Sequence, residues 1–125
     1  MSWQNVDSNL VGTGKITKAA ILGQQGGVWA ASAGYQPTAE EQAAIAKAFT
    51  DPSAAQANGV RVQGTKYLTL RADDRSVYAK KGADGIVLVK TKQAILVAEY
   101  AHPTAPGEAT KIVEDLADYL IGVGF

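Results

Sequence analysis

The chain has 125 residues, and its 12 Lys and Arg balance its 12 Asp and Glu, so its formal net charge is zero. This length predicts one domain, residues 1–125, built around a single hydrophobic core. The charge balance excludes a broad basic surface of the kind that gathers nucleic acid, and the absence of Cys excludes disulfides, thiolate nucleophiles and Cys-based zinc sites. No stretch has the character of a membrane span or a secretory leader, so we expect a cytoplasmic protein.

The first third of the chain predicts a helix followed by a hairpin. Residues 2–11 carry apolar side chains at helical spacing, begin with Ser2 as a plausible N-cap and stop at a Gly-Thr-Gly run. Residues 16–23 and 28–33 are β-compatible, and the glycines between them allow a hairpin turn.

A second helix is expected between Thr38 and Asp51. Thr38 followed three residues later by Glu41 is a capping-box pattern, and apolar residues follow at helical spacing. Asp51 precedes Pro52, which disfavours helical backbone, so the helix should end there.

Five strand-like segments separated by turn residues come next and predict an antiparallel meander. They are residues 60–62, 66–72, 75–80, 85–90 and 94–100. Thr104 and Pro106 then open a last helix with one apolar stripe and one charged side. Helices at both ends of a central antiparallel sheet make an α+β domain.

The groups that catalysis needs are scarce. His102 is the only histidine, so a multi-histidine metal site is impossible and a catalytic triad would depend on this one side chain. Residues 12–15 have the wrong spacing for a phosphate loop, and Lys15 is not followed by Ser or Thr. The acidic pairs lie in turn or cap contexts; these pairs are Glu40-Glu41 and Asp73-Asp74. We therefore expect a protein that is not an enzyme and that carries no cofactor or metal.

Aromatic and basic side chains are the remaining candidates for a binding role. If both terminal helices cover one sheet face, four aromatic residues would form a shallow groove that suits a polyproline II ligand; they are Trp3, Trp29, Tyr119 and Phe125. Basic residues concentrate between positions 71 and 92, which suits a carboxylate-rich partner but is equally typical of a solvated sheet edge.

Several segments resemble the profilin family, in the family's order and at both ends of the chain. They are Ser2-Trp3-Gln4, Val6-Asp7, residues 10–14, Trp29-Ala30, residues 70–78, Lys80-Lys81-Gly82, residues 106–109 and residues 116–122. The resemblance implies an α+β fold in which the N- and C-terminal helices pack together on one face of the sheet, with shorter helical segments on the other. It also implies a monomer of the actin cytoskeleton that binds monomeric actin, regulates polymerisation and nucleotide exchange, and binds proline-rich proteins such as formins and phosphoinositide headgroups at the membrane surface.

The resemblance further implies three sets of site residues. The polyproline set is Trp3, Trp29, Tyr119 and Phe125. The actin set is Arg71, Arg75, Tyr78, Lys80, Lys81, Lys90, Gly107, Thr110, Lys111 and Asp115. The phosphoinositide set is Lys66, Arg71, Lys80 and Lys81.

Two positions depart from the family pattern. Most profilins have a tyrosine just before the Val-Asp of the first helix, whereas here the segment Gln4-Asn5-Val6-Asp7 is one residue shorter and has no aromatic ring, so we expect polyproline binding to be weaker by ~1 kcal/mol. Ala79 stands where the family usually has Gly, and it would add strain of about 1 kcal/mol if that position required a positive φ or a bulge.

Two other functions remain as alternatives, since a fold does not fix a function. One is a small-molecule-binding or enzymatic α+β domain, for which a deep pocket with convergent polar groups would be evidence. The other is a dimerisation module that uses a sheet edge.

Overall fold

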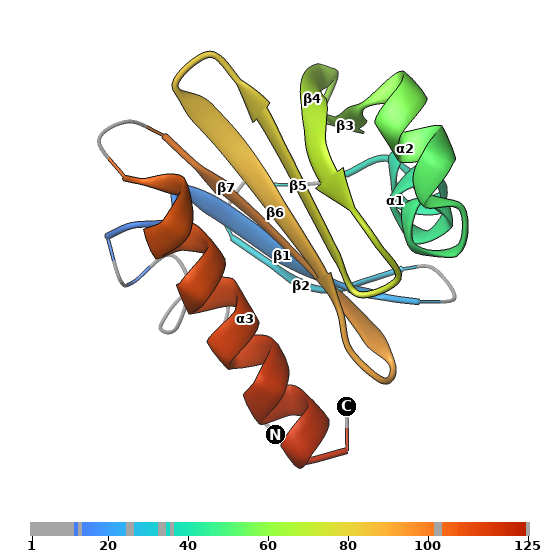
Figure 1. Ribbon diagram of the computed structural model, residues 1–125. Coiled ribbons are helices and arrows are strands. Elements are labelled where there is room, and N and C mark those ends of the chain that lie inside the picture. Colours follow the sequence, from blue (N-terminus) through green and yellow to red (C-terminus); the bar gives the residue numbers. More distant parts are fainter. Residues whose placement is uncertain are drawn as a thin grey trace.

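The computed structural model describes residues 12, 14–24, 27–32, 35, 37–101 and 104–124. Its centre is an antiparallel sheet of seven strands in the order β2-β1-β7-β6-β5-β4-β3 (Figure 1). The strands are β1 (Lys18–Gly23), β2 (Val28–Ala31), β3 (Val60–Val62), β4 (Thr65–Ala72), β5 (Ser76–Lys81), β6 (Asp84–Lys90) and β7 (Ala94–Tyr100). The helices are α1 (Ala39–Thr50), α2 (Pro52–Asn58) and α3 (Pro106–Gly122). The predicted α+β class is confirmed, while the helix predicted for residues 2–11 lies outside the described residues.

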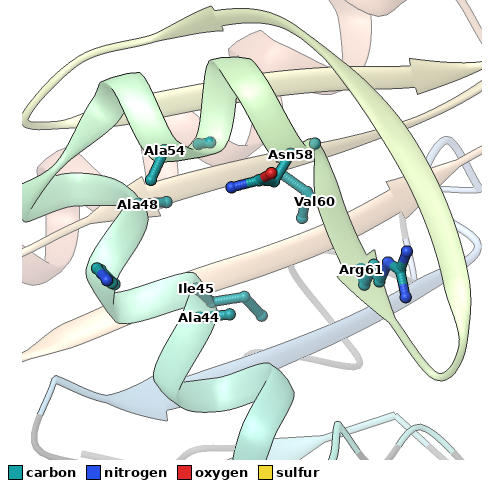
Figure 2. Close-up of a pocket in the computed structure, with 10 residues that line it drawn as sticks. Ala44, Ile45, Ala48, Ala54, Asn58, Val60 and Arg61 are labelled. Atoms are coloured by element: carbon teal, nitrogen blue, oxygen red, sulfur yellow. The ribbon is translucent and has the colours of Figure 1, made fainter.

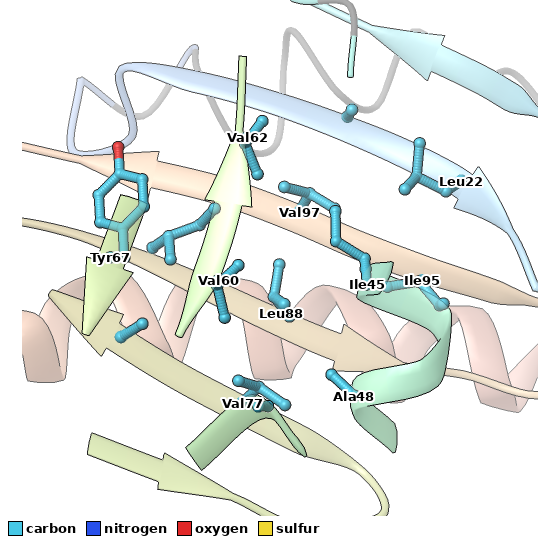
Figure 3. Close-up of a cluster of buried hydrophobic side chains, with 14 of the residues drawn as sticks. Leu22, Ile45, Ala48, Val60, Val62, Tyr67, Val77, Leu88, Ile95 and Val97 are labelled. Carbon is cyan, nitrogen blue, oxygen red and sulfur yellow. The ribbon is translucent and has the colours of Figure 1, made fainter. Parts of the chain in front are cut away.

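Each face of the sheet is covered by a different part of the chain (Figure 1). The apolar stripe of α3 packs on one face; its buried residues are Ala109, Val113, Leu116, Ala117 and Leu120. The two short helices α1 and α2 cover the other face, where Ile45 and Ala48 meet strand residues such as Leu88 and Val97 (Figure 3). Alternate residues of β1, β6 and β7 enter the two clusters, so these strands are buried on both sides. This confirms short helices on the face opposite to the C-terminal helix.

The ends of α1 agree with the sequence, but its neighbour α2 was missed. The N–H of Glu41 donates to Thr38 Oγ1 at 3.1 Å, and the N–H of Thr38 donates to Glu41 Oε1 at 2.9 Å, which completes the predicted capping box. The helix ends at Thr50, and Pro52 immediately begins α2. Proline is favourable at the first helical position because its fixed φ suits a helix and its missing N–H is not needed there. The same proline therefore ends one helix and starts the next.

An irregular register in the hairpin of β1 and β2 orients Trp29. Strict alternation would put Trp29 and Ala30 on opposite faces, but the register shifts between Ile21 and Leu22. As a result Trp29 and Ala30 both pack against the cluster under α3. Trp29 is half-buried there.

Ala79 occupies a regular position of β5. It pairs with Thr69 and Ile86, and Gln63 is the only described residue other than glycine with a positive φ. The bulge next to it belongs to β4, between Thr69 and Arg71. Alanine at this position therefore carries no backbone strain of the kind considered above.

Candidate functional site

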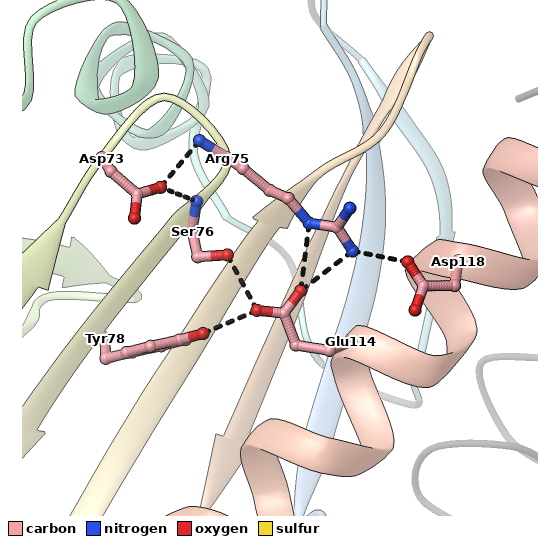
Figure 4. Close-up of polar contacts among 6 residues, drawn as sticks. All are labelled: Asp73, Arg75, Ser76, Tyr78, Glu114 and Asp118. Carbon is pink, nitrogen blue, oxygen red and sulfur yellow. Dashed lines mark hydrogen bonds and ion pairs between the residues drawn. The ribbon is translucent and has the colours of Figure 1, made fainter.

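Glu114 of α3 gathers three side chains of the β4–β5 hairpin (Figure 4). Arg75 donates to its carboxylate from Nε at 3.2 Å and from Nη2 at 3.1 Å. Ser76 Oγ donates at 2.8 Å and Tyr78 Oη at 2.6 Å. Arg75 Nη2 also donates to Asp118, one turn further along α3, at 2.8 Å. These bonds fix α3 against the beginning of β5.

The turn before β5 is held by Asp73. Its Oδ1 accepts from the N–H of Ser76 at 2.7 Å and from the N–H of Arg75 at 2.9 Å. These two backbone bonds lower the pKa of Asp73, with a smaller contribution from Arg71. Asp73 thereby starts β5 with Arg75, Ser76 and Tyr78 directed toward α3.

The two arginines of this hairpin differ in how far their guanidinium groups are engaged by other residues of the chain. Hydrogen bonds to Asp118 and then to Glu114 raise the pKa of Arg75, whose guanidinium is occupied within the molecule. The side chain of Arg71 is 69% exposed; it lies 3.4 Å from Asp73 and 6.0 Å from the centre of the Tyr78 ring. Burial and then Glu114 raise the pKa of Tyr78, so its phenol stays a hydrogen-bond donor. Of these two arginines, Arg71 is therefore the one whose guanidinium is exposed to a partner.

Two exposed leucines lie on β4 beside Arg71. Leu68 is 65% exposed and Leu70 is 60% exposed, which is unusual for side chains of this size. Leu68 pairs with Lys80, and Arg71 pairs with Tyr78, so these pairs share the α3 side of the sheet. The half-buried Tyr78 and four exposed residues form a group that we call the hairpin face: Leu68, Leu70, Arg71, Tyr78 and Lys80.

The predicted actin residues of α3 lie next to the hairpin face. Gly107, Thr110 and Lys111 precede Glu114 by seven, four and three residues respectively, so they share its side of the helix. Asp115 is exposed and pairs with Lys111 at 3.1 Å.

Two predicted lysines lie elsewhere. Lys90 borders Ala46 and Phe49 of α1, on the face of the sheet opposite to α3. Lys81 has the same strand parity as Val77 and Ala79, which also belong to the α1–α2 side. Of the four predicted phosphoinositide residues, Lys66, Arg71 and Lys80 share the hairpin-face parity, and Lys81 does not.

Two of the predicted polyproline residues are described. Trp29 packs against the cluster beneath α3, and Tyr119 is 53% exposed on α3 itself. Val123 follows Tyr119 by four residues and is 49% exposed, so the two form an apolar patch near the end of the helix. Trp3 and Phe125 lie outside the described residues.

Sequence reasoning missed Leu68, Leu70 and Glu114. The leucines alternate with Tyr67 and Thr69, and this pattern also fits a strand that buries its leucines. The pairing of Leu68 with Lys80 shows that this side of β4 is exposed to solvent. Glu114 looked like one of several solvated acids on the helix, because its partners lie 36 to 39 positions away in the chain.

Among the residues that the structure describes, the polar groups elsewhere do not form a catalytic arrangement. The phenol of Tyr67 donates to Glu99, and burial followed by Glu99 raises the pKa of both Tyr67 and Tyr35, so neither serves as a base near neutral pH. No group of three or more potential metal ligands occurs among the described residues. None of the described helices is long and apolar enough to cross a bilayer.

Comparison with known proteins places the chain in one family. The family model described as profilin matches residues 1–125. Profilin-2 of Acanthamoeba castellanii is 55% identical over 126 residues, and profilin of Saccharomyces cerevisiae is 49% identical, with full coverage of both chains in each case.

Solved structures agree with these sequence relatives. The crystal structure of Acanthamoeba castellanii profilin II covers 99% of this chain and 100% of its own, with 54% identity and a TM-score of 0.96. Mouse profilin IIa in complex with a double repeat from the FH1 domain of mDia1 shares the fold at 23% identity, full coverage of both chains and a TM-score of 0.81. Profilins are cytoplasmic proteins that bind actin monomers, polyproline segments and phosphoinositides, and they are not enzymes. The chain belongs to the profilin family.

Proposed function

We propose that this profilin binds an actin monomer through the hairpin face and the adjoining side of α3, and proline-rich segments such as those of formins through the Tyr119 end of α3. It acts in the actin cytoskeleton as a monomer. Its phosphoinositide site uses Lys66, Arg71 and Lys80, so headgroups at a membrane surface compete with actin for the hairpin face.

One observation carries this proposal. The large apolar side chains that are exposed in the described part of the chain are Leu68, Leu70, Tyr119 and Val123. They form two pairs, one on β4 beside Arg71 and one near the end of α3. Exposed apolar groups beside charged ones are typical of protein interaction sites, and these two pairs lie next to Arg71 and Tyr119, for which the resemblance to profilins implies roles in binding actin and proline-rich ligands.

The effect on actin needs no catalytic group in the profilin. A protein that binds more tightly to actin with an open nucleotide cleft raises the population of that state by its differential affinity. Nucleotide exchange then accelerates, and polymerisation is controlled by the amount of bound monomer. This mechanism fits a site made of Arg71, Lys80 and two leucines.

Arg71→Glu should weaken actin binding by about tenfold or more, because a reversed charge at the exposed guanidinium opposes a carboxylate-rich partner. A fluorescence titration with labelled monomeric actin measures this change. The melting temperature should stay within a few degrees, because the Arg71–Asp73 pair is exposed and contributes little. Lys92→Glu makes the same charge change in the turn between β6 and β7 and should leave the affinity unchanged. Equal affinities for Arg71→Glu and the parent protein would contradict the actin assignment.

Tyr119→Ala should reduce binding to a polyproline peptide by roughly fivefold to tenfold, as expected for the loss of one aromatic contact. Intrinsic tryptophan fluorescence follows the titration.

The parent protein itself should bind about fivefold more weakly than a profilin with the N-terminal tyrosine, and replacing Asn5 by Tyr should recover part of that difference. If the parent protein bound the polyproline peptide as tightly as a profilin with the N-terminal tyrosine, the proposed effect of Asn5 would be refuted.

A further inference from the structure

Two cations lie directly opposite each other at the β3 edge of the sheet, Arg61 of β3 and Lys66 of β4. The preceding residue Val60 pairs with Tyr67, and both belong to the core under α1 and α2. Because successive strand residues alternate between the two faces, Arg61 and Lys66 project from the other face, where both are exposed. Arg61 also borders a small cavity between α1, α2 and β3, but Figure 2 shows its side chain extending away from the cavity residues Ala48 and Val60.

The described part of the chain provides no ion-pair partner for these two cations. Like charges directly opposite each other are unfavourable, and the sequences of β3, β4 and β5 contain no Asp or Glu. Glu41 reaches the tip of the hairpin from α1, but its carboxylate accepts from the N–H groups of residues 38 and 64. Asp84 pairs with Lys81, which belongs to the α1–α2 side of the sheet. The pair of Arg61 and Lys66 is therefore open to an anion from outside the chain.

The side chain of Lys66 is positioned by the backbone beside it. Its Cε lies 3.3 Å from the place that a Cβ on Gly59 would occupy, so the stem runs along the residues that lead into β3. The next pair on the same face is Leu68 with Lys80, two residues or about 7 Å further along β4. Arg61, Lys66 and Lys80 therefore form one group of three cations that continues the hairpin face toward the β3 edge.

A phosphomonoester matches the pair of Arg61 and Lys66 better than a carboxylate does. It carries about 1.5 to 2 negative charges near pH 7 and offers three acceptor oxygens, whereas a carboxylate carries a single charge. The planar guanidinium of Arg61 can bind two of these oxygens, and the ammonium group of Lys66 can bind the third. One bound phosphate would thus remove the repulsion within the pair.

We infer that Arg61 and Lys66 together hold one phosphomonoester of a polyphosphoinositide headgroup, with a second phosphate placed toward Lys80. This inference rests on the phosphoinositide site proposed above. It adds Arg61, which none of the three sets of site residues contains, and it restricts the ligand to headgroups that carry phosphomonoesters. Phosphatidylserine, whose headgroup has a carboxylate and a phosphodiester, should bind less tightly at the same membrane charge.

The test compares the full chain on two kinds of phosphatidylcholine vesicle that are matched in total charge, one containing phosphatidylinositol bisphosphate and the other phosphatidylserine. Cosedimentation should show that Arg61→Gln binds the first kind about fivefold more weakly than the parent does, and the second kind less than about twofold more weakly. Calorimetric titration with inositol trisphosphate should show the same loss of about fivefold, because this soluble headgroup carries the phosphates without the bilayer.

Lys92→Gln is the matched control, since it removes the same charge from an exposed residue in the turn between β6 and β7. Its affinity for the bisphosphate vesicles should stay within about twofold of that of the parent. Arg61→Lys keeps the charge but loses the planar fork, so its affinity should lie between those of the parent and Arg61→Gln. The melting temperature of Arg61→Gln should not fall, because the substitution removes the repulsion from Lys66.

The outcomes separate this inference from the proposed function. If the parent binds the bisphosphate vesicles and Arg61→Gln binds them as tightly as Lys92→Gln does, the role of Arg61 is overturned while the site of Lys66, Arg71 and Lys80 stands. Equal losses for Arg61→Gln on both kinds of vesicle would show only a general attraction to negative membranes and would also overturn it. Binding of inositol trisphosphate without binding to the bisphosphate vesicles would contradict the membrane source of the phosphate. A parent protein that binds neither would refute the proposed phosphoinositide site itself.

Discussion

Gly59→Ala should lower the free energy of unfolding by about 3–5 kcal/mol, a large loss for the addition of a single methyl group. Gly59 ends α2 with φ 74° and ψ −170°, a backbone conformation that is nearly restricted to glycine. A Cβ at this position would also lie 2.4 Å from the carbonyl oxygen of Tyr67. That oxygen belongs to the backbone of β4 and cannot move aside without breaking the packing of β3 on β4. Urea denaturation followed by tryptophan fluorescence measures the loss.

Gly64→Ala is the matched control for Gly59→Ala. Gly64 also has a positive φ, of 79°, but nothing lies within 4 Å of the Cβ that alanine would add. Its cost should be only that of the left-handed backbone, about 1–2 kcal/mol. Equal losses for the two variants would mean that the close approach to Tyr67 contributes nothing.

Glu114→Ala should destabilise the protein by about 2–3 kcal/mol, because it removes the common acceptor of three donors. The hydroxyl of Ser76, a residue only 5% exposed, would lose its partner, and so would the phenol of Tyr78. Arg75 would keep only Asp118. We also expect actin affinity to fall by about threefold to tenfold, since Tyr78 and α3 would no longer be held in place next to Arg71. Denaturation and an actin titration on the same variant measure both effects.

Asp115→Ala is the stability control for this prediction. Asp115 is the next residue on α3, and its pair with Lys111 is exposed and four positions apart, so its loss should cost about 0.3–0.5 kcal/mol. The stability of Glu114→Gln should lie between that of Glu114→Ala and that of Asp115→Ala, because the glutamine amide keeps an oxygen acceptor but loses the charge. A Glu114→Ala protein as stable as Asp115→Ala would show that the bonds in Figure 4 do not stabilise the fold.

The parts of the fold that depend on neighbouring residues were predictable. The capping box at Thr38 and Glu41, the strand β7 and the beginning of α3 at Pro106 follow from short-range patterns, and the structure confirms them. The sequence does not predict the helix α2, because Asp51-Pro52 is read most simply as the end of the preceding helix. The seven residues of α2 are too few for a helical periodicity to appear.

The parts of the site that depend on distant residues were not predictable from local patterns. Lys90 and Arg71 look alike in the sequence, yet the register of β6 directs Lys90 toward α1. Arg75 looks like an exposed turn residue until α3 brings Glu114 and Asp118 beside it. The bulges in β1–β2 and in β4 also change which side chains share a face, and nothing in the local sequence of β4 marks its bulge.

The position of β1 in the sheet has a consequence for how the chain is made. β1 pairs with β7 from Lys18↔Glu99 to Gly23↔Ala94, so the pairing of these two strands joins segments that are about seventy to eighty residues apart. During synthesis, β1 has only the short hairpin partner β2 until the ribosome has released residue 100. Its apolar residues Ala19 to Leu22, which are fully buried in the finished protein, stay accessible to chaperones for that interval. Closing so long a loop is slow compared with forming α1 or the β6–β7 hairpin, so completion of the core belongs to the last stage of folding.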